Sequence, residues 1–134
     1  MWDLLEAIIS YLSTNEDLEN LSYHKDAMPE TPHKLVAIYE IKGVGPVRGG
    51  AGASRAFQIV ARSSSDDPEW AKTIAWSIYE MLSFPDQIFD LRELEEPIDF
   101  WGVMAPRQTP FKISVDKNNR TLYGFNVAIV TQVD

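Results

Sequence analysis

The stretch Arg55-Ala-Phe-Gln-Ile-Val-Ala-Arg62 decides the fold. Its residues Phe57, Ile59 and Ala61 fall on one side of an extended chain, and this alternation predicts a strand with a strongly apolar face. Ser63-Ser-Ser-Asp-Asp67 breaks the strand, and an apolar pattern with helical spacing follows. Because the strand and the helix each have an apolar face, we expect them to cover each other.

The helix is predicted to begin at Pro68, with Asp67 as its N-cap, and to end near Leu82. Proline loses nothing at the first helical position, because its missing N–H would have no partner there. One apolar stripe, wide enough to lie on a sheet, contains Trp70, Ala71, Ile74, Ala75, Ile78, Met81 and Leu82.

Trp76 lies nearly opposite this stripe, on the polar face of the predicted helix. A tryptophan in that position either packs under a loop of its own chain or contacts another chain, and aromatic residues are enriched at interface cores. We therefore take Trp76, with Lys72 and Glu80, as a candidate interface with another subunit or partner. Arg62, at the end of the strand, is either a salt-bridge partner within the chain or a further interface residue.

The composition describes a chain of single-domain size. It has 134 residues, 45% of them apolar, no cysteine, a net charge of -8 and a pI of about 4.7. We expect one domain over residues 1–134, with no disulfide or thiolate chemistry. No apolar run approaches the roughly 20 residues that a membrane helix needs, and no basic segment suggests a secretory signal. An acidic chain lacks the counterion-release drive that holds nucleic acid, but it can line a passage through which nucleic acid slides.

The remaining elements complete an α+β pattern. We predict a helix over 2–12, an ordered loop or a loop with a short helical turn over 13–34, a strand over 35–41, a connection over 83–97, strands over 99–104, 111–115 and 121–133, and a turn over 116–120. The order is helix, two strands, helix, three strands. Two hairpins favour a mainly antiparallel sheet with flanking helices.

The segment from Lys42 to Ser54 holds five of the seven glycines. A P-loop would end in Gly-Lys-Ser/Thr before a helix, and a dinucleotide fingerprint would need a glycine in place of Arg48. We predict instead a hairpin loop, from Gly43 to Ser54, that is poorly ordered in a free subunit and settles on assembly. Its candidate interface residues are Val44, Val47, Arg48, Gly49 and Gly50.

The residues offer little for catalysis. His24 and His33 lie in the polar loop without metal-ligand spacing, and a helix cap with its first turn accounts for Asp66, Asp67 and Glu69. The acidic residues of the 83–97 connection suit magnesium or calcium, but a solvated acidic loop explains them as well. We predict no enzyme, catalytic residue, metal or cofactor. A small carboxylate-dependent enzyme and a monomeric ligand-binding domain remain the alternative classes.

Two parts of the chain together resemble a known family. The run Phe57-Gln-Ile-Val-Ala-Arg62 and the helical pattern after it are similar to bacteriophage minor capsid and tail terminator (tail-completion) proteins. The C-terminal part strengthens the resemblance, with Pro110-Phe111, Asp116, Asn119-Arg120 and Phe125-Asn126 before an apolar strand. Asn119 stands where the family commonly has a glycine in the turn.

The resemblance implies a structural role in the virion. Proteins of this kind form a ring, usually of six copies, that caps the tail tube and joins it to the head connector. The expected partners are therefore identical subunits, the tail tube protein and a head-completion or connector protein. DNA would pass through the ring without specific binding. Assembly is expected in the bacterial host cytoplasm, without a membrane.

Overall fold

The described part of the chain folds into one sheet with two helices, which confirms the predicted α+β class. The computed structural model describes residues 4–41, 53–82, 88–90, 101–106 and 108–132. Along these residues the elements are α1 (Leu4–Leu12), β1 (Tyr23–Lys25), β2 (Leu35–Ile41), β3 (Ala53–Arg62), α2 (Trp70–Leu82), β4 (Ile88–Asp90), β5 (Trp101–Pro106), β6 (Phe111–Val115) and β7 (Thr121–Gln132). Within this described part, no helix is long and apolar enough to cross a membrane.

The sheet is built around the long antiparallel pair β3 and β7. The strand order is β1-β2-β3-β7-β5-β4, and β6 also pairs with β7. β7 accommodates two neighbours on one side because β6 lies along Thr121–Gly124 and β5 lies along Val127–Gln132. Only β1 with β2 is parallel among the described pairs, so the sheet is mainly antiparallel, as predicted, with one parallel edge.

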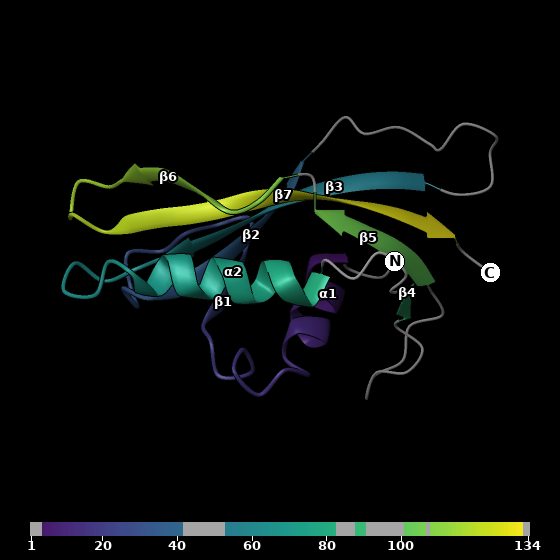
Figure 1. Cartoon of the computed structure of the whole chain (residues 1–134), viewed down its shortest axis with the longest axis horizontal. Coiled ribbons are helices and arrows are strands. Elements are labelled where there is room, and N and C mark those ends of the chain that lie inside the picture. Colours follow the sequence, from purple (N-terminus) through teal and green to yellow (C-terminus); the bar gives the residue numbers. More distant parts are fainter. Residues whose placement is uncertain (1–3, 42–52, 83–87, 91–100, 107, 133–134) are drawn as a thin grey trace.

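Both helices lie on the same face of the sheet (Figure 1). The predicted apolar face of β3 points toward them, since Phe57, Ile59 and Ala61 are fully buried in the core cluster. The α2 stripe is buried against it, with Ala71, Ile74, Ala75, Ile78 and Leu82 inside. Burying one side chain of leucine or phenylalanine size contributes about 1.5–3 kcal/mol. The mutual cover of β3 and α2 therefore contributes substantially to the stability of the core, which Phe125 and Val127 of β7 share.

The start of α2 differs from the prediction. The helix begins at Trp70 instead of Pro68, and the side chain that caps its first turn is not that of Asp67, although the Trp70 N–H donates to the Asp67 carbonyl over 3.3 Å. The Ala71 N–H donates to Ser63 Oγ over 2.8 Å, while the Asp67 carboxylate accepts from Lys34 Nζ over 2.9 Å. Ser63 takes the capping role because it is buried directly after β3, below the first turn of α2.

Several connections also depart from expectation. The predicted loop over 13–34 contains β1, and the connection over 83–97 contains β4. Each of these strands has only three residues, which is too short for an alternating pattern to be recognised in the sequence. β5 begins at Trp101 and ends at Pro106, two residues later than predicted, with residues 99 and 100 outside the described part. β3 begins at Ala53, so the end of the predicted Gly43–Ser54 loop is a strand, and residues 43–52 lie outside the described part.

Gly124 marks a close approach of β7 to β3 on the face opposite the helices. A Cβ at this position would overlap the carbonyl oxygen of Ile59 and lie 3.0 Å from Cδ1 of Ile113. Ile113 sits at an irregularity in the β6–β7 register, between Lys112 and Ser114. This bulge changes the direction of the β6 side chains, and the Ile113 side chain packs over Gly124.

Candidate functional site

Strand β6 presents an uncovered apolar surface. All five of its residues are exposed, and Phe111, Ile113 and Val115 keep 41%, 38% and 43% of their surface in water. Among the described strands, β6 pairs with β7 alone, so its outer side is a sheet edge. Native proteins shield such edges or use them to bind another chain. The sequence predicted this strand but gave no sign that its own chain leaves it uncovered.

The outer face of α2 is a second surface. Lys72 and Glu80 are exposed, as predicted, and Trp76 is half-buried. The Trp76 ring meets the Tyr79 ring edge to face at 5.3 Å, and Tyr79 meets Phe125 in the same way at 5.7 Å. These aromatic contacts join Trp76 to the core through its own helix and leave part of the indole accessible. Its role as an interface residue stays a prediction.

The other predicted interface residues divide into two groups. Val44, Val47, Arg48, Gly49 and Gly50 lie outside the described residues. Arg62 is described and is only 2% exposed. Its Nε donates to the His33 carbonyl over 2.9 Å, and its Nη2 donates to the carbonyls of Pro32 and Glu30 over 2.7 and 3.3 Å. Of the two alternatives for Arg62, the structure favours a partner within the chain, because the guanidinium is buried and occupied there.

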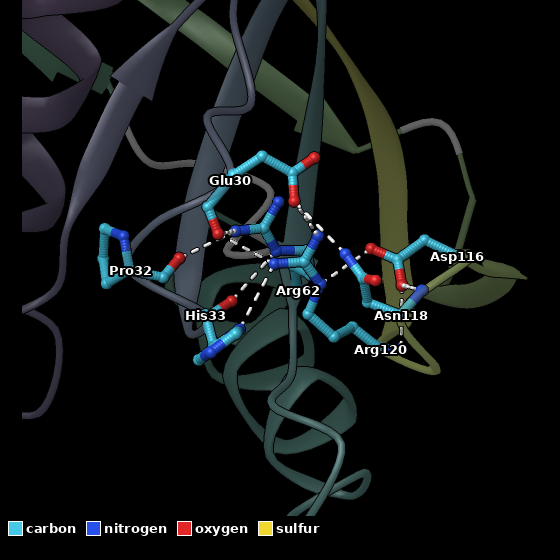
Figure 2. Close-up of polar contacts among 7 residues, drawn as sticks. All are labelled: Glu30, Pro32, His33, Arg62, Asp116, Asn118 and Arg120. Carbon is cyan, nitrogen blue, oxygen red and sulfur yellow. Dashed lines mark hydrogen bonds and ion pairs between the residues drawn. The ribbon is translucent and has the colours of Figure 1, made fainter.

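A second arginine lies beside the first (Figure 2). Arg120 is also 2% exposed, and its Nη1 shares the Glu30 carbonyl with Arg62, at 2.9 Å. Its Nε binds the Asp116 carboxylate at 2.8 Å, and its Nη2 binds the Glu30 carboxylate at 3.2 Å. Burial, and then the charge of Arg120, lower the pKa of the Arg62 guanidinium. Two buried cations thus tie the 30–33 segment to β3 and to the β6–β7 turn.

The β6–β7 turn is held by Asp116. Its Oδ1 accepts from the Asn118 and Arg120 N–H groups, each over 2.9 Å. Burial acts to raise the pKa of Asp116, but these bonds and the Arg120 guanidinium outweigh it, so the pKa lies below its ordinary value. Asn119 has a φ of 61°, a conformation that glycine or asparagine adopts readily. This explains why asparagine serves where the family commonly has glycine.

The two predicted loop histidines lie in separate polar contacts. His24 Nε2 lies 2.8 Å from Ser22 Oγ, and His33 Nδ1 lies 3.3 Å from Arg120 Nη1. Within the described ranges, no three His, Asp or Glu side chains gather so that they could hold a metal ion. The contacts that these residues make are hydrogen bonds and ion pairs within the chain.

Comparison with known proteins agrees with the sequence resemblance. A family model described as "Bacteriophage tail terminator protein" matches residues 11–133. A solved structure that carries only a sequence identifier as its name superposes with a TM-score of 0.55, at 10% identity, over 98% of this chain and 92% of that chain; this likeness concerns the fold alone. No curated protein sequence matches the chain. The family match spans both the arginine pair and the two exposed surfaces, and the chain belongs to the bacteriophage tail terminator family.

Proposed function

We propose that this structural protein of the phage tail assembles as a ring, with six copies the expected number, that closes the finished tail tube and joins it to the head connector. The observation that carries the proposal is the family match over residues 11–133. The exposed apolar strand β6 and the accessible part of Trp76 support it, because a subunit of an assembly must present apolar surface to its neighbours.

The net charge of -8 suits a ring through which DNA passes. A lumen lined by an acidic protein would repel the phosphate backbone and offer no counterion-release gain, so DNA would slide without sticking. The ring would assemble in the host cytoplasm, on tail tubes that have reached their final length. The chain would have no hydrolase, transferase or redox activity in this role.

The direct test is assembly on tail tubes. Purified protein is added to tubes of the tail tube protein that were grown without it, and the tubes are examined by electron microscopy and by mass measurement. We expect one compact cap on one end of each tube, a multiple of the subunit mass, and capped tubes that bind head connectors. A protein that stays monomeric at every concentration and leaves the tubes bare would refute the proposal.

A further inference from the structure

Two of the edge strands in the described sheet, β1 and β6, lie on one line across it. Tyr23 of β1 pairs with Val36, Val36 with Ala61, Ala61 with Tyr123, and Tyr123 with Lys112 of β6. β1 and β6 are therefore at opposite ends of the same row of residues.

The β6 edge combines apolar residues with cations. Lys112 and Lys117 are exposed, and neither takes part in an ion pair within the described residues. Lys112 is the register partner of Tyr123, which packs against the core cluster, so Lys112 points to the helix side of the sheet. Phe111 pairs with Gly124 and points to the other side.

The turn beside β1 carries the opposite charge, while Lys25 of β1 itself pairs with Glu6 of α1 at 3.1 Å. Glu16, Asp17 and Glu19 are exposed in the turn that follows α1, while Leu18 between them is buried in the core cluster. The Tyr23 hydroxyl donates to the Leu18 carbonyl over 2.7 Å, which fixes this acidic turn beside β1. Because α1 and Leu18 belong to the core on the helix side, the acidic turn lies on the same side of the sheet as Lys112.

We propose that neighbouring copies of this chain dock head to tail, with the β6 edge of one copy against β1 and the acidic turn of the next. The inference rests on the ring proposed above, since a cyclic ring needs two different patches that fit each other. Charge selects a second copy as the occupant: the lysines of β6 and its turn meet three carboxylates, on the same side of a continued sheet. The outer face of α2 is then left for the tail tube or the connector.

Cysteine cross-linking tests this contact, because the chain has no cysteine of its own. The double variant Lys112→Cys with Glu19→Cys places one thiol at each edge. Four strand spacings of about 4.8 Å separate β1 from β6 within a subunit, far beyond the roughly 7 Å limit between Cα atoms for a disulfide. Bonds can therefore form only between copies, and we expect a ladder of covalent multimers after oxidation. Each single variant should give dimers at most, and Lys72→Cys with Glu19→Cys is the matched control that should give no ladder.

A charge exchange gives a second readout. Lys112→Glu or Glu19→Lys alone should raise the subunit concentration for half-assembly by several-fold and up to about tenfold, because each turns an attraction into a repulsion. The two changes together should restore assembly. If the wild-type protein forms rings but gives neither ladder nor rescue, the docking surface is wrong and the ring stands. If the wild-type protein forms no ring in solution or on tubes, the proposed function fails, and this inference fails with it.

Discussion

Replacing Arg62 by methionine should destabilise the subunit strongly, although residue 62 would keep most of its volume. The substitution removes the hydrogen bonds to the carbonyls of Glu30, Pro32 and His33. A hydrogen bond to a charged group contributes about 1.5–3 kcal/mol. Two effects reduce the loss: the 30–33 segment is exposed enough for water to reach its carbonyls, and the repulsion by Arg120 disappears. We expect a net loss of about 2–3 kcal/mol.

Thermal and urea unfolding of the monomer measure this loss. For a domain of this size, 1 kcal/mol corresponds to a change of roughly 3–5 °C in Tm, so the midpoint should fall by about 6–15 °C. Lys72→Met is the matched control, because Lys72 is exposed, and its effect should stay within about 0.5 kcal/mol. Arg62→Lys should recover less than half of the loss, since an ammonium lacks the planar fork that reaches several carbonyls. An Arg62→Met variant as stable as the control would refute the argument, as would full recovery by lysine.

Three further predictions follow from single positions. Gly124→Ala should cost about 1–3 kcal/mol, because the added Cβ meets a backbone oxygen of β3 that cannot move aside, and urea unfolding would check it. Asp116→Asn should destabilise the subunit at pH 7 by about 1–2 kcal/mol. Because the pKa of Asp116 is lowered in the folded state, the difference in unfolding free energy between variant and wild type should be complete above pH ~4 and should vanish as the pH falls through the folded pKa. Thermal melts between pH 2 and 7 would show this. Trp76→Ala should lower subunit stability by only about 1 kcal/mol, the value of one aromatic contact, yet weaken tail joining; a large drop in Tm with normal joining would mean that Trp76 serves its own chain.

The central strand and helix were predictable because their pattern has one strong period. β3 and α2 each place apolar residues on one face, and the structure buries those faces against each other. The cap of α2 was predicted wrongly because the capping hydroxyl belongs to Ser63, at the end of β3 and outside the positions that directly flank the helix. The Asp67 carboxylate instead accepts from Lys34, which lies in a distant part of the chain.

The arginine pair could not be assembled from the sequence. Arg62 and Arg120 meet the same carbonyl of Glu30, although 32 and 90 residues separate them from it. Only the pairing of β3 with β7 brings the two arginines together, through the register of Arg62 with Leu122. The local part of the cluster, with Asp116 four residues before Arg120, was visible as a turn. The remaining contacts depend on the tertiary fold.

Strand β6 shows a different limit of sequence reasoning, which bears on how the ring is held together. The alternation of Phe111, Ile113 and Val115 predicts a strand with an apolar face, and such a face normally lies in the core. In the subunit these side chains are exposed, and Phe111 and Ile113 lie on the side of Gly124, opposite the two helices. An alternating apolar pattern predicts that one face of a strand is buried, but it does not indicate whether the same chain or a neighbouring chain covers that face. An apolar edge strand left bare in the subunit, with lysines beside it and carboxylates at the opposite edge, is the pattern that burial by the next copy would require.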